Sequence, residues 1–260
     1  MDVDNHSFRF SRLLLTLLGL LMLAVAVWGC SDGSPNVDSN GPAEGLSGES
    51  QGVDGSQEVI FTTADGIELS GRAFGVGDIG LVLAHMYPAD QTSWFPAAEE
   101  LAAQGYLVLT FDFRGYGESS GSKDIALIDR DVEAAVKQIE ALGAENVGLV
   151  GASMGGTACL MVAASDPVAA VATLSAPVEF RGLSAAEAVT QVQAPKLFMA
   201  AEDDVGAQGA RDLYDSAQDP REILIVPGSD HGTDLLDGDS GDEAWAALVG
   251  FLQRNVPVER

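Results

Sequence analysis

The chain has 260 residues, of which 47% are hydrophobic, so it holds enough apolar material for a sizeable core in one or two domains. It carries 13 Lys and Arg against 39 Asp and Glu, and the formal net charge of −26 argues against binding to the phosphate backbone of nucleic acids. With two cysteines and three histidines, a disulfide scaffold and a cysteine-rich zinc site are excluded, and we expect neither a metal nor a cofactor.

Residues 1–29 are typical of an export signal. Arg9 and Arg12 precede an apolar run over residues 13–28, which is shorter than the about 20 residues of a membrane-spanning helix. The run ends in Val-Trp-Gly-Cys, which resembles a bacterial lipobox, so Cys30 is the predicted lipidation site and new N-terminus. The alternative is an uncleaved N-terminal anchor. In both cases we expect the rest of the chain to be exported and held at the periplasmic or extracellular face of a membrane.

Residues 30–57 are predicted to form a disordered acidic tether. From residue 31 to residue 57 there are six Gly, six Ser and five acidic residues but no Lys or Arg, which leaves too little apolar surface to order the segment. We expect the folded domain to span residues 58–260. The acidity, with 23 Asp against 16 Glu and only three Lys, resembles that of proteins from salt-loving organisms; a merely acidic extracellular protein is the alternative.

Strands and helices alternate along this domain. Apolar runs around Asp65-Gly66 predict a hairpin. Further strands are expected at 81–84, 106–111, 147–150, 168–174, 196–200 and 223–226, and helices at 95–104, 125–142, 156–164, 207–217 and 243–254. The strands are continuously apolar, which indicates burial on both faces and hence a mostly parallel sheet covered by helices, the α/β class. Residues 175–194 leave room for one short helix and a loop, a minimal lid.

The pattern Gly-x-Ser-x-Gly occurs four times, beginning at residues 29, 48, 117 and 151. Only the copy centred on Ser153 directly follows a buried strand and directly opens a helix. A turn in that position lifts the serine hydroxyl above the sheet, and the helix N-terminus directs N–H groups toward developing negative charge. The alternative is a serine in an ordinary loop between a strand and a helix.

A serine hydroxyl is a weak nucleophile without a base. His85 ends an early strand, whereas His231 lies in a Gly-rich loop after the last strand. The base in turn needs an acid that fixes its tautomer, and Glu202-Asp203-Asp204 follows the strand at 196–200.

From residue 60 onward the sequence resembles α/β-hydrolases of the compact lipase/esterase or dienelactone-hydrolase-like kind. The motifs that carry the resemblance are LAHM at 83–86, DFRGYGES at 112–119, GASMGG at 151–156, EDD at 202–204 and DHG at 230–232. The resemblance implies Ser153 as nucleophile, His231 as base and Asp204 as the acid, with Asp203 as the alternative acid. It also implies an oxyanion hole with the N–H of Met154 as one donor. Met86 stands where this family commonly has glycine, and the N–H of Tyr87 is the expected second donor, with Met86 behind it.

These residues predict a serine hydrolase that cleaves carboxylic esters or related acyl bonds of a small molecule outside the cell membrane. Thioester, lactone or peptide hydrolysis stays open, because a fold does not select its substrate. The competing function is a non-catalytic lipoprotein that uses the same fold to bind a ligand. The acidic segment 234–243 departs from calcium-loop spacing at Gly241, so we expect a solvated loop there.

Overall fold

The structure, a computed structural model, describes residues 55–258. The predicted signal peptide, Cys30 and residues 30–54 of the predicted tether lie outside the described residues. The first strand begins at Gln57, one residue before the expected boundary, and the preceding Ser56 is buried. Within residues 55–258 no helix combines the length and the apolar character that crossing a membrane requires.

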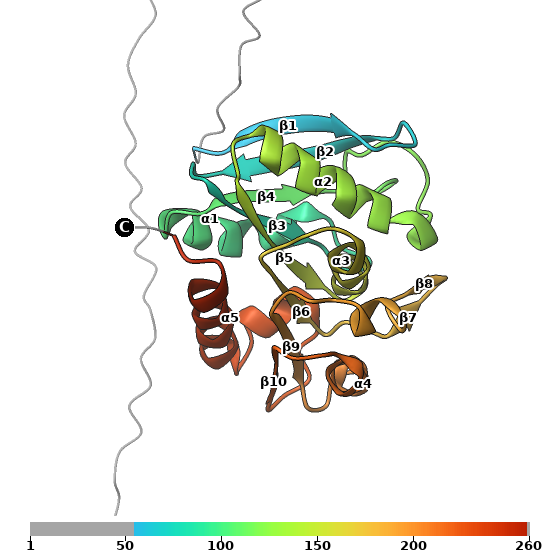
Figure 1. The fold of residues 1–260 in the computed structure, drawn as a ribbon, viewed down its shortest axis with the longest axis vertical. Helices are drawn as coiled ribbons and strands as arrows, with labels where there is room; N and C mark the ends of the chain where they lie inside the picture. Colours follow the sequence, from blue (N-terminus) through green and yellow to red (C-terminus); the bar gives the residue numbers. More distant parts are fainter. Residues whose placement is uncertain (1–54, 259–260) are drawn as a thin grey trace, which may run out of the picture. The chain divides into compact units, whose positions relative to one another are not determined.

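An eight-stranded sheet forms the centre of the described body (Figure 1). β1 and β2 form the antiparallel hairpin predicted around Asp65-Gly66; β2 and β4 are also antiparallel, and every other neighbouring pair is parallel. In spatial order the strands are β1 (Gln57–Thr62), β2 (Glu68–Phe74), β4 (Leu107–Phe111), β3 (Ile79–Ala84), β5 (Asn146–Ala152), β6 (Ala170–Leu174), β9 (Lys196–Ala201) and β10 (Arg221–Val226). The mostly parallel sheet is therefore confirmed.

Helices cover both faces of this sheet, as Figure 1 shows. α1 (Phe95–Ala103) and α5 (Gly241–Asn255) pack into one apolar cluster, and α2 (Asp129–Ala141), α3 (Met154–Ser165) and α4 (Ala207–Ser216) pack into the other. Every residue of β3, β4, β6 and β9 is buried, which explains why these strands are continuously apolar in the sequence. Cys159 of α3 is fully buried within this second cluster.

Three segments differ from the sequence prediction. The acidic segment 234–243, expected to be a solvated loop, begins within a 3-10 turn, Gly232–Leu236, in which Leu235 is buried, and from Gly241 it belongs to α5. The expected helix at 125–142 begins as a 3-10 turn, Ile125–Leu127, and α2 starts only at Asp129. Residues 175–194 form a small hairpin, β7 (Glu179–Phe180) and β8 (Leu183–Ser184), followed by a 3-10 turn, rather than one short helix and a loop. The hairpin forms because Arg181 and Gly182 both adopt positive φ angles, 48° and 92°, which allow the chain to reverse in two residues.

The carboxyl ends of the parallel strands meet at one edge of the sheet, since the register places the last residues of neighbouring strands side by side, as with Ala152 of β5 and Leu174 of β6. In open α/β sheets this edge is where ligands bind. The segments that follow β3, β5, β6, β9 and β10 contribute Tyr87, Ser153, Ser175, Asp204 and His231 respectively.

Candidate active site

Ser153 occupies a strained turn between β5 and α3. Its φ of 49° and ψ of −119° lie in a region that residues other than glycine rarely adopt, and its N–H donates a hydrogen bond to the carbonyl of Leu174 at 2.8 Å. Glycine is required on both sides of it. A Cβ atom at Gly155 would lie 2.5 Å from the carbonyl oxygen of Ala84, and one at Gly151 would lie 2.5 Å from the carbonyl of Gly155. The local sequence thus lets strand and helix approach closely enough to form the turn.

The structure brings His231 and Asp204 together. His231 Nδ1 lies 2.7 Å from Asp204 Oδ1; the Asp204 side chain is 2% exposed and that of His231 is 31% exposed. Asp203 is exposed, and its backbone N–H donates to the carbonyl of Gly228 at 2.9 Å. Asp204 is therefore the carboxylate that contacts the imidazole. A carboxylate on Nδ1 keeps the proton there and leaves Nε2 free to accept one.

Ser153 and His231 line the same cavity, whose volume is about 170 Å³. Since a water molecule occupies about 30 Å³ of liquid, the cavity has room for roughly five or six groups of that size. Four hollows elsewhere are larger, about 300 to 510 Å³, and among the residues that line them Ser70 is the one serine, with no cysteine or histidine. The lining residues, and not the volume, therefore distinguish this cavity from the other hollows. The full lining consists of Tyr87, Ser153, Ser175, Pro177, Phe180, Val205, Gly206 and His231.

His85 fixes the segment that contains Tyr87. Its Nε2 accepts a hydrogen bond from the backbone N–H of Phe113 at 3.1 Å, so its Nδ1 carries the proton and donates to the carbonyl of Met86 at 2.8 Å. The Met86 carbonyl and the Tyr87 N–H belong to one planar peptide group and point in opposite directions. The imidazole of His85 therefore sets the direction of the Tyr87 N–H. Burial lowers the pKa of His85, which keeps the ring neutral in this role.

Met154 is the first residue of α3, where backbone N–H groups have no partner within the helix. Its side chain is fully buried, so its position beside the turn is fixed by packing. Met86 also packs at the site: its sulfur accepts a long contact, 3.9 Å, from the hydroxyl of Thr233 in the histidine loop.

Sequence reasoning missed Ser175. This residue follows β6, is fully buried, has a φ of 58° and lines the cavity. Its hydroxyl accepts a hydrogen bond from the backbone N–H of Gly232 at 3.0 Å. No motif surrounds it; the only signal in the sequence was its place directly after a buried strand, at the edge where the other site residues gather.

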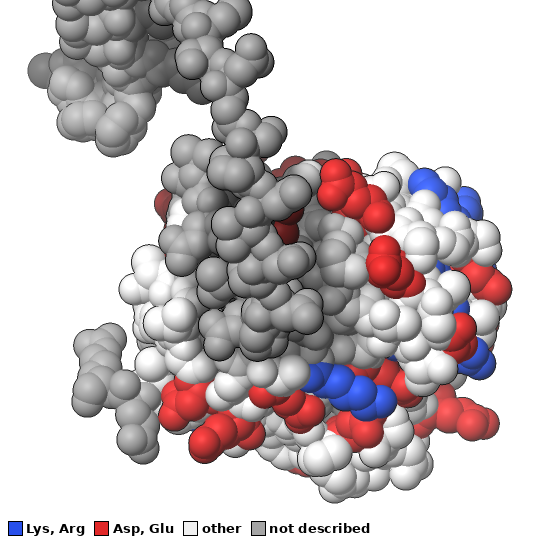
Figure 2. All heavy atoms as spheres, turned by 90° about the horizontal axis from the view of Figure 1, so that it is seen from above, with Lys and Arg blue, Asp and Glu red and all other residues white. Residues whose placement is uncertain are grey.

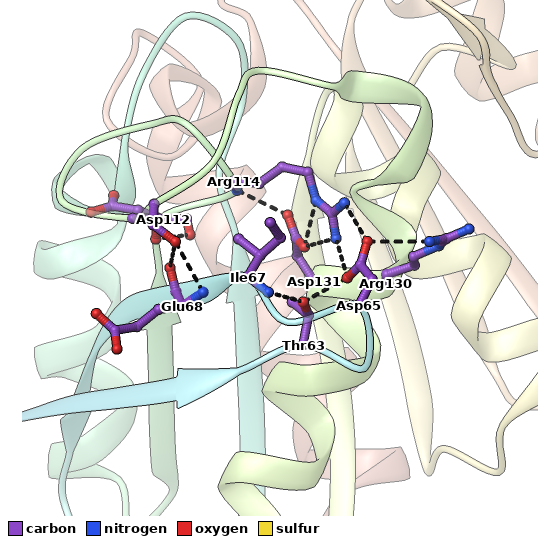
Figure 3. A network of polar contacts seen from close by, with 10 residues as sticks. Thr63, Asp65, Ile67, Glu68, Asp112, Arg114, Arg130 and Asp131 are labelled. Atoms are coloured by element: carbon purple, nitrogen blue, oxygen red, sulfur yellow. Dashed lines mark hydrogen bonds and ion pairs between the residues drawn. The ribbon is translucent and has the colours of Figure 1, made fainter.

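Two carboxylates hold the neighbouring loops. Asp112 accepts hydrogen bonds from the backbone N–H groups of Gln91 and Glu118, at 2.9 and 3.0 Å. Asp131 binds the guanidinium of Arg114, which also reaches Asp65 (Figure 3). These groups stabilise the segments beside the site and are not part of the cavity lining. Within residues 55–258, no cluster of three or more His, Cys, Asp or Glu side chains suits a metal ion.

Comparison with known proteins identifies the family. A sequence model of the alpha/beta hydrolase fold matches residues 81–223, more than half of the chain. The chain belongs to the alpha/beta hydrolase fold family. Membership of this family supports hydrolase activity.

Three relatives illustrate the range of similarity within this hydrolase family. An uncharacterised protein of Mycobacterium tuberculosis is 25% identical over 210 residues, which cover 70% of this chain and 75% of the relative. The human serine hydrolase BPHL is 33% identical over 107 residues, 40% of this chain and 37% of the relative. Among solved structures, the Pyrococcus furiosus esterase Pf2001 superimposes with a TM-score of 0.69 and 19% identity, over 77% of this chain and 93% of the esterase. At that identity the likeness shows the fold alone.

Proposed function

We propose that this hydrolase is a serine hydrolase that cleaves carboxylic esters, or related acyl bonds, through an acyl-enzyme formed on Ser153. The observation that carries the proposal is the joint placement of the strained serine and of a histidine bonded to a buried carboxylate around one cavity. A structural serine does not need a strained turn, and backbone strain of this kind concentrates at functional sites.

In the first half of the proposed reaction, Ser153 Oγ attacks the carbonyl carbon of the substrate while His231 Nε2 takes the hydroxyl proton. The carbonyl oxygen becomes an oxyanion, which the N–H groups of Met154 and Tyr87 stabilise. The tetrahedral intermediate then collapses: the bond to the leaving alcohol breaks, His231 returns the proton to that oxygen, and the acyl group stays on Ser153. Asp204 stabilises the imidazolium that forms transiently.

In the second half, water replaces the alcohol. His231 removes a proton from the water as its oxygen attacks the acyl carbon, and collapse of the second intermediate returns the proton to Ser153 Oγ and releases the carboxylic acid. No group is consumed in the cycle except the ester and water.

The cavity favours small acyl groups. Its volume of about 170 Å³ suits a chain of a few carbons, and Tyr87, Pro177, Phe180 and Val205 give it apolar walls. The hairpin β7–β8 is too short to form a closing domain over it. These features support small-molecule esters, with thioesters and lactones of similar size as the related alternatives.

We further propose that the enzyme works outside the cell membrane, anchored through a lipid on Cys30. This part rests on the sequence alone, on the apolar run ending at Cys30 and the acidic Gly- and Ser-rich segment after it.

The test is hydrolysis of p-nitrophenyl acetate and p-nitrophenyl butyrate by the purified protein beside Ser153→Ala, together with labelling by a fluorophosphonate. We expect turnover and labelling that the substitution abolishes. Equal background rates in both folded proteins, with no labelling of Ser153, would contradict the proposal and favour the non-catalytic binding module.

A further inference from the structure

The tip of the β7–β8 hairpin places an arginine beside the catalytic cavity. The guanidinium carbon of Arg181 lies 4.3 Å from the ring centroid of Tyr87 and 5.2 Å from that of Phe180. Both rings line the cavity that contains Ser153 and His231, and they contact each other at a centroid distance of 5.9 Å. The positive charge is therefore held at the rim of the site by the same aromatic side chains that form its wall.

The backbone at this tip would suit a different residue. Two-residue hairpin turns with positive φ at both positions favour Asn or Gly at the first one, because a larger side chain is strained there. Arg181 adopts a φ of 48° and is followed by Gly182 at 92°. Arginine is disfavoured in this backbone conformation. Its presence here therefore indicates that the side chain has a role other than forming the turn.

Arg181 is also left without a charged partner. Within residues 55–258 it makes no hydrogen bond and no ion pair, although acidic side chains are spread over the visible face of the molecule (Figure 2). Two other exposed arginines among the described residues do find carboxylates: Arg130 contacts Asp65 at 3.2 Å and Arg254 contacts Glu222 at 2.7 Å. In a protein with a net charge of −26, an unpaired cation at the mouth of the site makes the electrostatic potential there locally more positive.

A second cation extends this positive potential. The Nζ atom of Lys123 lies 4.2 Å from the ring centroid of Tyr116, and the rings of Tyr116 and Tyr87 meet edge to face at 6.5 Å. Lys123, like Arg181, makes no ion pair in the described part of the chain. The hydroxyl of Tyr116 is buried and has no hydrogen-bond partner among the described residues.

We propose that Arg181, with Lys123 behind it, selects acyl substrates that carry a carboxylate a few atoms from the scissile bond. This inference rests on the proposed hydrolase function of Ser153 and names its substrate class. The guanidinium stays stacked on Tyr87 and pairs with the substrate carboxylate through its free N–H groups, as planar guanidinium groups do. The short apolar cavity holds the part of the substrate between that carboxylate and the reacting carbonyl.

The carboxylate can belong to the acyl group or to the leaving alcohol, so the experiment has two arms. The first compares kcat/KM for p-nitrophenyl hydrogen glutarate with that for p-nitrophenyl pentanoate, and the second compares 4-acetoxybenzoate with its methyl ester. Each ratio of charged to neutral substrate is measured for the full-length protein and for Arg181→Met, which keeps an aliphatic side chain and removes the charge. Lys137→Met is the matched control, because Lys137 is an exposed lysine of α2 away from the cavity.

We expect Arg181→Met to lower the charged-to-neutral ratio about five- to tenfold in one arm, mainly through KM, and Arg181→Lys to lower it less. Lys137→Met should leave the ratio as it is. In the unsubstituted protein, about 1 M salt should reduce the preference for the charged substrate, because the Debye length is then about 3 Å and the charge of Arg181 is screened. A ratio that Arg181→Met does not change in either arm, or that Lys137→Met changes equally, would overturn the inference.

The two proposals fail in different ways. Hydrolysis that depends on Ser153, with a charged-to-neutral ratio that does not depend on Arg181 in either arm, would overturn only the substrate class. Absence of Ser153-dependent hydrolysis for all four esters, with no fluorophosphonate labelling, would overturn the proposed function and with it this inference.

Discussion

The hydroxyl of Ser175 accepts a hydrogen bond from the backbone N–H of Gly232, the residue that follows His231. This bond, 3.0 Å long, connects the end of β6 to the loop that presents the imidazole. Both groups are buried, so the bond holds the histidine loop at a fixed height above the sheet.

Ser175→Ala should therefore lower kcat about five- to twentyfold with a smaller effect on KM, because a buried N–H left unpaired costs about 1–3 kcal/mol and the loop shifts to satisfy it. Ser175→Gly is the matched control: it also lacks the hydroxyl but accepts the φ of 58° without strain. Equal losses of kcat in both variants would assign the effect to the hydroxyl. Recovery of activity in the glycine variant would contradict this assignment and point to backbone strain.

His85→Ala should lower kcat by about tenfold to hundredfold while the fluorophosphonate still reaches Ser153. The reason is that the Met86–Tyr87 peptide loses the donor that sets its direction, and loss of an oxyanion donor costs a comparable or larger factor. Steady-state kinetics together with the thermal unfolding midpoint would check this. A loss of kcat fully explained by a smaller folded fraction would argue against a positioning role.

The lowered pKa of His85 also predicts how the free energy of unfolding depends on pH. Burial lowers its pKa from 6.5, so the unfolded chain binds a proton more readily than the folded one. The stabilising contribution is complete above pH 6.5 and decreases as the pH falls below that value. The free energy of unfolding in urea should therefore decrease between pH 7 and pH 5, and less steeply in His85→Gln. Identical slopes for both proteins would show that other groups cause the dependence.

Arg114→Met should destabilise the fold by about 3–5 kcal/mol, because the fully buried Asp131 would lose its counterion and would either stay charged without a partner or have to take up a proton. Arg130→Met provides the comparison: Arg130 contacts Asp65 at 3.2 Å but is 46% exposed, and such surface pairs contribute about 0–1 kcal/mol. Both values follow from urea unfolding. Similar losses in the two variants would mean that burial does not govern the strength of these pairs.

The net charge of −26 predicts a dependence on salt. Repulsion among the acidic side chains is screened as the Debye length shortens from about 10 Å at 0.1 M to about 3 Å at 1 M. The thermal unfolding midpoint should rise as sodium chloride increases over this range. A midpoint that stays constant or falls would contradict the hypothesis that the protein is adapted to high salt.

The sequence predicted most of the architecture because continuously apolar strands, alternating with helices, have few arrangements that bury them. The turn at Ser153 was predictable because its glycines and its place between strand and helix are local features. The β7–β8 hairpin was missed because Arg181 takes a backbone conformation that arginine rarely adopts, so no residue type signalled the turn.

Ser175 was missed for a different reason. Its contact with Gly232 joins residues 57 positions apart in the chain, and it forms because only β9 separates β6 from β10, the strand that precedes the histidine loop. The choice of Asp204 over Asp203 likewise depends on where β9 ends, which a sequence pattern defines only to within one or two residues.

The thiol of Cys159 can report local unfolding of the protein at α3. The thiol is fully buried in α3, the helix that begins directly after Ser153, and burial raises its pKa and suppresses its reactivity. A thiol reagent can therefore reach it only when α3 separates from the sheet. The rate of its modification, measured with and without the acyl group proposed to form on Ser153, would report how much that intermediate slows the separation, without any cysteine being introduced.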